Sequence, residues 1–233
     1  MDVDIEKILG LASVWILPVL IAVTLHEAAH AYVARLLGDD TATKLGRVSL
    51  NPAKHIDPVG TILLPGMLIF SGAPFLFGWA KPVPVVFGRL GNPKRDMIFV
   101  AIAGPVSNIF IAIVAALCFN FVTLFQDPTL IEWVAKNLWN AIQINLVLAI
   151  FNMIPILPLD GGRILTGLLP VPLAIKFSKS ERYGMFLLIG LIFLLPMIGR
   201  SLGTDLDLFR HIIGGSQDVL IPYFKDLMTL FRF

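Results

Sequence analysis

The stretch that decides the fold is Ile21-Ala22-Val23-Thr24-Leu25-His26-Glu27-Ala28-Ala29-His30. It ends an apolar run that begins near residue 8, as expected for a helix that crosses a membrane. His26 and His30 are four residues apart, so their imidazoles lie on one helix face and can bind the same metal ion. Glu27 is placed to take a proton from a water molecule that the metal activates. The stretch therefore predicts a zinc site inside a membrane helix.

A second informative stretch is Asn152-Met153-Ile154-Pro155-Ile156-Leu157-Pro158-Leu159-Asp160-Gly161-Gly162-Arg163. Its prolines break a helix, and its glycine pair frees the backbone. One interpretation is simply a helix end followed by a turn. The other is that Asp160, a lone acid beside an apolar span, completes a zinc site with two histidines and one carboxylate, leaving the fourth position for water.

The composition is typical of a polytopic membrane protein. The 233 residues are 57% hydrophobic and 15% charged, with a mean hydropathy of +0.83, whereas about a quarter of the residues in soluble domains are charged. The net charge of +2 is too small to indicate a nucleic-acid partner. The single cysteine, Cys118, excludes a disulfide framework and a cysteine-rich zinc site. We expect one all-α domain over residues 1–233, embedded in the lipid bilayer.

Four apolar segments are expected to cross the bilayer, at about 8–37, 97–125, 139–159 and 184–199. Positive charge is uneven, because residues 35–96 carry eight and residues 163–182 carry four of the 18 Lys and Arg. The positive-inside rule places these two stretches in the cytoplasm and the N-terminus outside. The tail, 217–233, has its polar residues roughly on one side and is expected to form an interfacial amphipathic helix.

A further apolar stretch, residues 59–79, is interrupted by proline and glycine. If it crossed the bilayer, His30 and Asp160 would lie near opposite faces, so we expect a re-entrant element within 41–87. A small β-element is expected around 41–58 and 79–87. Because Pro82 and Pro84 exclude a central strand, 79–87 is expected to be an edge strand.

Together, the His26–His30 motif and the segment ending in Asp160-Gly161-Gly162 closely resemble the site-2 protease family of intramembrane zinc metalloproteases. The pattern of that family is His-Glu-x-x-His on a helix and a later Asn-x-x-Pro-x-x-x-x-Asp-Gly segment. Residues 77–85, Phe-Gly-Trp-Ala-Lys-Pro-Val-Pro-Val, and 103–108, Ala-Gly-Pro-Val-Ser-Asn, also resemble its small bacterial and archaeal members. The resemblance covers about residues 20–170, and no PDZ or CBS domain is expected.

The resemblance implies that one Zn²⁺ per chain is bound by His26, His30 and Asp160, and that Glu27 is the catalytic base. It implies hydrolysis of peptide bonds in transmembrane protein substrates, and the charge pattern puts the site towards the cytoplasmic side. An extended substrate would add to the 79–87 edge, at Val83 and Val85. The substrate's identity and the oligomeric state stay open.

Three more residues have two interpretations each. Asn108 belongs to a stripe of small residues, with Gly104, Ala112 and Ala116, that predicts close helix packing. Its amide would either bind substrate or an oxyanion, or form an interhelical hydrogen bond. Asn152 would bind substrate backbone or cap its own helix. His55 would approach the metal or pair with Asp57.

Other functional classes are compatible with the same three ligands. A membrane metal-ion transporter or metal-binding protein would use His26, His30 and Asp160 as a transport site, although no inverted repeat of spans is apparent. A catalytically inactive membrane module is a third possibility, and two buried core histidines without a metal are a fourth. The complete set of ligands and base favours the hydrolase.

Overall fold

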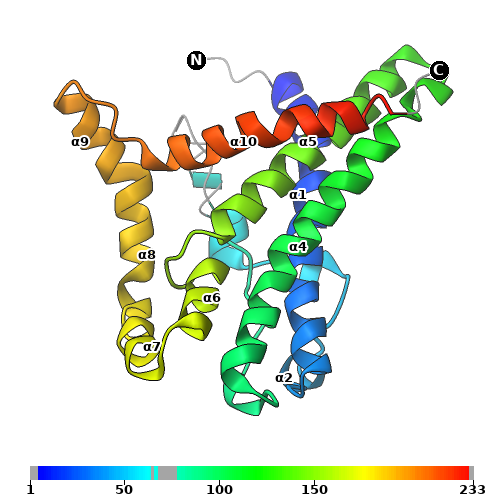
Figure 1. Ribbon diagram of the computed structural model, residues 1–233. Coiled ribbons are helices and arrows are strands. Elements are labelled where there is room, and N and C mark those ends of the chain that lie inside the picture. Colours follow the sequence, from blue (N-terminus) through cyan, green and yellow to red (C-terminus); the bar gives the residue numbers. More distant parts are fainter. Residues whose placement is uncertain (1–4, 64–65, 68–77, 231–233) are drawn as a thin grey trace.

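The computed structural model describes residues 5–63, 66–67 and 78–230 and consists of helices joined by irregular segments (Figure 1). Within this described part, four helical segments are long and apolar enough to cross a membrane: Leu9–Leu36, Pro93–Leu124, Pro128–Asn152 and Glu181–Ser201. This agrees with the four crossings expected from the sequence. The chain is therefore a multi-pass α-helical membrane protein.

Three helices form the central bundle: α1 (Ile5–Leu36), α4 (Pro93–Phe119) and α5 (Pro128–Asn152). The α4 and α5 helices each begin with proline after a capping side chain, Asn92 or Asp127, that accepts a backbone hydrogen bond. The α4 helix packs against both of the others. Small residues of α4, among them Ala112 and Ala116, are fully buried, and the cluster also contains Ile142 of α5. Small residues let helix backbones approach closely in a membrane.

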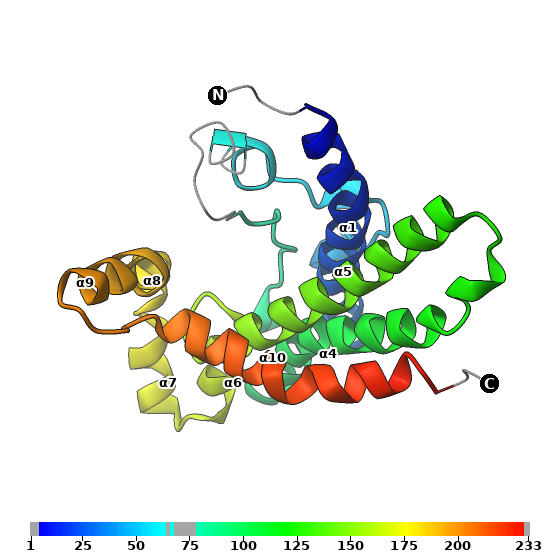
Figure 2. The ribbon, with the colours of Figure 1, turned by 90° about the horizontal axis from the view of Figure 1, so that it is seen from above.

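The later helices lie to one side of this bundle or run across it (Figures 1 and 2). The chain leaves α5 through residues 153–159 and enters α6 (Asp160–Leu168) and then α7 (Val171–Ser178). Next, α8 (Glu181–Ile189), a π-turn (Gly190–Leu194) and α9 (Leu195–Ser201) run on from one another and stand to one side. The α10 helix (Leu208–Leu227) packs on α4 and α5 and buries Phe224.

Two predicted boundaries differ from the structure. The third span was expected at 139–159 after a loop, but α5 begins at Pro128, because Asp127 caps it and Glu132 pairs with Lys136 one turn later. The C-terminal helix begins at Leu208 rather than near residue 217. Its interfacial position stays a prediction.

The predicted β-element is wrong for the described residues. Residues 41–58 contain α2 (Thr41–Lys44) and a 3₁₀ turn (Pro52–Lys54), and a π-turn (Pro58–Leu63) follows. Residues 78–86 have no helix or strand and lead into a 3₁₀ turn (Phe87–Arg89). Prolines remove two backbone donors from 78–86, and carboxylates accept two others, so no ladder forms. Much of the expected re-entrant stretch, 59–79, lies outside the described residues, and that topology stays a prediction.

One carboxylate ties the end of α1 to the 78–86 segment. The helix stops where Gly38 adopts a φ of 110°, and the next residue, Asp39, is fully buried. Asp39 accepts hydrogen bonds from Thr41 and from the backbone N–H of Val86, the latter at 2.6 Å. Burial by itself raises the pKa of Asp39. These hydrogen bonds outweigh that effect, so the pKa of Asp39 lies below its usual 3.8. The segment is thereby held beside α1.

Candidate metal centre

Three buried side chains converge from two distant parts of the chain. His26 and His30 lie on α1, and Asp160 is the first residue of α6. The two Nε2 atoms are 3.0 Å apart, and each lies 3.3 Å from a carboxylate oxygen of Asp160. The three ligand atoms lie within 4.8 Å of one another. These residues could therefore hold one metal ion together.

The other nitrogen of each imidazole contacts α4. His26 Nδ1 lies 2.6 Å from Oδ1 of Asn108, and His30 Nδ1 lies 2.7 Å from the backbone oxygen of Val100. A carbonyl oxygen only accepts hydrogen bonds, so both Nδ1 atoms carry a proton and donate it. In a neutral imidazole the opposite nitrogen then has a free lone pair. Both Nε2 lone pairs are therefore available at the centre.

The donor set fits zinc. Without a cation, two lone-pair nitrogens and a carboxylate at these distances repel one another, and Oδ2 of Asp160 has no hydrogen-bond partner among the described residues. Tetrahedral zinc with bonds of about 2.0–2.1 Å separates neighbouring ligand atoms by about 3.3 Å. The Nε2 atoms of His26 and His30 are 3.0 Å apart, close to that spacing, and each lies 3.3 Å from a different carboxylate oxygen of Asp160. Two histidines and a carboxylate also leave a fourth position open, as in catalytic zinc sites.

The α4 helix can approach α1 closely because residue 104 of α4 is glycine. A Cβ atom there would overlap the imidazole rings of both His26 and His30. Asn108 lies one turn further along α4, and its side chain is fully buried. The small-residue stripe that was predicted to mediate close packing, Gly104, Asn108, Ala112 and Ala116, is buried along its whole length. Packing of α4 therefore shapes the metal centre directly.

A second pair of glycines positions Asp160. A Cβ at Gly161 would overlap the backbone of Met153, and one at Gly162 would lie within 2.5 Å of the backbone nitrogen of Leu157. The backbone between α5 and α6 folds tightly against the start of α6 at these two positions. This tight turn places the carboxylate of Asp160 beside His26 and His30 of α1.

The carboxylate of Glu27 contacts the 78–86 segment. Its Oε2 accepts a hydrogen bond of 2.7 Å from the backbone N–H of Val83. The Val83 side chain is buried in a cluster with Ala31 and Ala42, and Val85 packs against a neighbouring cluster. The Val85 N–H has no hydrogen-bond partner within the described ranges. The predicted substrate contacts of Val83 and Val85 stay predictions.

Other residues singled out in the sequence lie elsewhere. The amide of Asn152 donates to Leu148 O within its own helix, and its substrate role stays a prediction. His55 is buried with Nε2 2.8 Å from Ser49 O, whereas Asp57 accepts from backbone groups of the following turn. Among the described residues, the potential metal cluster contains His26, His30 and Asp160 but not His55. The sequence did not predict the contact of His30 with the backbone carbonyl of Val100, because every residue type carries such an acceptor.

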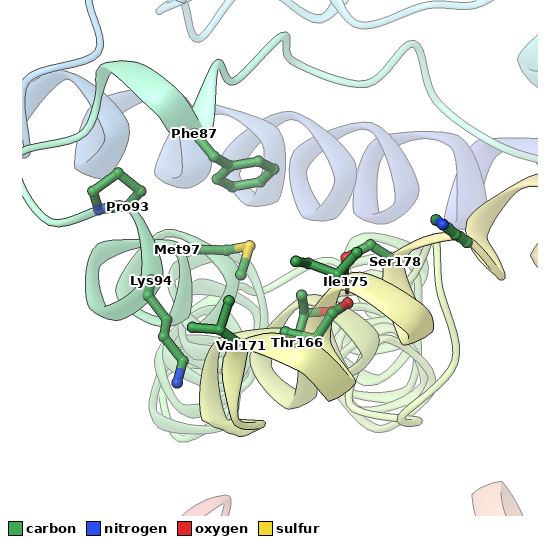
Figure 3. A pocket seen from close by; sticks show the side chains of 10 residues that line it. Phe87, Pro93, Lys94, Met97, Thr166, Val171, Ile175 and Ser178 are labelled. Atoms are coloured by element: carbon green, nitrogen blue, oxygen red, sulfur yellow. Dashed lines mark hydrogen bonds between the residues drawn. The ribbon is translucent and has the colours of Figure 1, made fainter.

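A surface cavity of about 560 Å³ lies beside α4, α6 and α7 (Figure 3). Its lining comes from Phe87, the first turns of α4, and residues of α6 and α7, and most of it is apolar. None of the three potential metal ligands lines it. The buried cluster, rather than this cavity, therefore defines the candidate site.

We predict that Gly104→Ala reduces zinc content strongly, because the added methyl group must displace an imidazole or push α4 away. Overpacking of this kind costs about 1–3 kcal/mol. The measurement is zinc per chain in purified protein. Gly215→Ala is the control, because a Cβ at Gly215 in α10 meets nothing within 4 Å. Wild-type zinc content in Gly104→Ala would contradict the role of this close approach.

Comparisons with known proteins agree with the geometry. The family model of peptidase family M50 matches residues 121–197. YwhC of Bacillus subtilis, named as a zinc metalloprotease, is 38% identical over 220 residues, which cover 88% of this chain and 94% of the relative. Rip2 of Mycolicibacterium smegmatis, with a similar name, is 26% identical over 84% of this chain and 74% of its own length.

A third relative, the zinc metalloprotease MJ0392 of Methanocaldococcus jannaschii, is 27% identical over 164 residues, which are 70% of this chain and 34% of the relative. No solved structure gives a significant match. These relatives favour the hydrolase over the transporter. The likeness to YwhC spans nearly the whole of both chains, and this chain therefore belongs to peptidase family M50, the site-2 protease family, as a membrane zinc metalloprotease.

Proposed function

We propose that this protease hydrolyses peptide bonds of transmembrane proteins, with zinc held by His26, His30 and Asp160 and with Glu27 as general base. The observation that carries this proposal is the convergence of the three buried ligands beside Glu27 on a membrane-spanning helix. Ionisable groups at such a depth are rare and usually functional.

The chemistry divides between the ion and the chain. When bound, zinc lowers the pKa of water towards 7 and polarises a carbonyl group. Glu27 follows a proposed ligand directly and is half-buried. Its carboxylate takes the proton of the attacking water and later passes it to the leaving nitrogen. The bond from the Val83 N–H fixes one carboxylate oxygen, leaving the other for the proton.

Substrate must reach the site in extended form, because a transmembrane helix keeps its carbonyls hydrogen-bonded. The 78–86 segment supplies an irregular backbone beside Glu27, held by Asp39 and by Arg47, whose guanidinium donates to Lys81 O at 2.8 Å. We infer that an unwound substrate pairs with the N–H of Val85, a donor that has no partner in the described structure and lies between the bonded N–H groups of Val83 and Val86.

The orientation follows from charge. The Lys and Arg of residues 35–96 and 163–182 favour a cytoplasmic location for both stretches, with the N-terminus outside. The proposed ligands then lie towards the cytoplasmic side, because His30 is near the end of α1 and Asp160 follows α5.

We predict that Glu27→Gln lowers cleavage of a single-span substrate by about 10²–10⁴-fold, the usual contribution of a general base. The amide cannot take a proton, but its oxygen still accepts the Val83 hydrogen bond, so zinc content should equal that of wild type. Glu132→Gln, which removes an exposed carboxylate on α5, is the control for charge loss. Retained cleavage in Glu27→Gln would exclude Glu27 as the base.

For substrate pairing, we predict that Val85→Pro slows cleavage at unchanged zinc content, because it removes the backbone donor proposed to pair with the substrate. Val85→Ala keeps that donor and should retain most of the activity. A higher helix propensity near the cleavage site of the substrate should slow wild type in the same direction. Equal cleavage by the Pro and Ala variants would refute strand addition at Val85.

For orientation, we predict that cysteines replacing Leu45 and Lys94 react with an impermeant thiol reagent only from the cytoplasmic face, in a Cys118→Ser background. A cysteine replacing the exposed Leu124 should react from the outer face. Labelling of positions 45 and 94 from opposite faces would require an extra crossing between them and would overturn the topology.

A further inference from the structure

A chain of buried amides extends from the metal centre into α5. Asn108 and Asn145 are both fully buried in the apolar bundle. Beyond the contact of His26 with Asn108, the Nδ2 of Asn108 donates to Asn145 Oδ1 at 2.7 Å, and the Nδ2 of Asn145 donates to Ala141 O at 2.8 Å. Asn145 therefore connects α5 to the proposed zinc ligand through one intervening side chain.

The direction of every bond in this chain is set at its far end. The backbone oxygen of Ala141 only accepts, so Asn145 must present its NH₂ group there and its oxygen to Asn108. Asn108 must then present its own NH₂ to Asn145 and its oxygen to His26. Consequently His26 is protonated at Nδ1, and its Nε2 lone pair faces Asp160.

The acceptors of the two histidines differ in how strictly they require a proton on Nδ1. His30 donates to the backbone oxygen of Val100, which cannot exchange an acceptor for a donor. His26 donates to a side-chain amide, which can rotate by half a turn and present NH₂ instead. A flipped Asn108 would donate to Nδ1 and favour the tautomer with the proton on Nε2, which cannot bind a metal. His26 is thus the ligand that needs further support.

Two acceptors hold Asn108 in the productive orientation. Its NH₂ group lies 3.3 Å from Ala22 O on α1 and 2.7 Å from Asn145 Oδ1. The Asn145 contact is the shorter, and a flipped Asn108 would face that oxygen with its own. We propose that Asn145 is a positioning residue of the metal centre, which holds Asn108 so that Nε2 of His26 stays free for the metal. This rests on the proposed function only through the assignment of His26 as a ligand.

The first test is zinc affinity, measured on full-length protein in detergent by competition with a chelator. Asn145→Leu keeps a similar volume but cannot orient Asn108, and we expect about tenfold weaker zinc binding, the lower range for loss of a supporting partner. Asn140→Leu is a matched control, because Asn140 is also buried on α5 but donates to Val14 O, away from the histidines. Its affinity should stay within about twofold of wild type on the same reasoning.

The second test separates orientation from general packing. In Asn108→Asp the side chain has only acceptor oxygens, so it accepts from His26 without help from Asn145. Adding Asn145→Leu to this variant should cause no further loss of zinc affinity. A tenfold loss in both backgrounds would mean that Asn145 does not act by orienting the side chain at position 108 and would overturn the proposal. If Asn145→Leu does not fold, Asn145→Ala replaces it in both backgrounds.

A further variant distinguishes failure of this proposal from failure of the ligand assignment. His26→Ala should weaken zinc binding far more than Asn145→Leu. If His26→Ala binds zinc as wild type does, the ligand assignment and the positioning role both fall. If zinc binding is lost in His26→Ala but unchanged in Asn145→Leu, the ligand assignment stands and the positioning role is refuted.

Discussion

The arrangement of the whole centre depends on two hydrogen bonds, from Nδ1 of His26 and Nδ1 of His30 to oxygens on α4. Because these bonds use the ring protons, both Nε2 lone pairs turn towards Asp160. Two lone pairs and a carboxylate at such distances repel one another unless a cation lies between them. The bundle must therefore hold α4 very close to α1, and the glycine at position 104 makes that approach sterically possible.

The apolar surroundings of a membrane protein explain why buried polar groups of the bundle form chains of hydrogen bonds. An unpaired polar group in an apolar medium costs several kcal/mol by transfer measurements, of the order of 2–7. The amides of Asn108 and Asn145 satisfy each other and end on a backbone carbonyl. The charged groups at the end of α1 behave similarly, since Asp39 and Glu27 each accept a backbone N–H from the 78–86 segment. The proposed chemistry is thus surrounded by a polar framework that the helices themselves supply.

Local patterns in the sequence predicted the convergence of His26, His30 and Asp160 and the number of spans. The His26–His30 spacing is a property of one helix, and Asp160 stands out as an acid after an apolar span, so both were found without knowledge of the fold. Contacts between backbone and side chain were not predictable. The Val83 N–H and the Val100 carbonyl are backbone groups, and the identity of their residues does not indicate what these groups bind. The prediction of a β-element was wrong because two backbone N–H groups of the proline-containing 78–86 segment donate to carboxylates and not to a neighbouring strand. Asn145 carried no signal beyond being polar in an apolar segment.

X-ray absorption spectroscopy at the zinc edge, on full-length protein purified without chelators, would examine the ligand set most directly. We expect one zinc per chain with four nitrogen or oxygen neighbours at about 2.0–2.1 Å, including the multiple scattering of two imidazoles, and loss of one light neighbour or of the metal in Asp160→Ala. A coordination sphere with one imidazole or none, or an unchanged spectrum at full zinc occupancy in Asp160→Ala, would contradict the proposed centre.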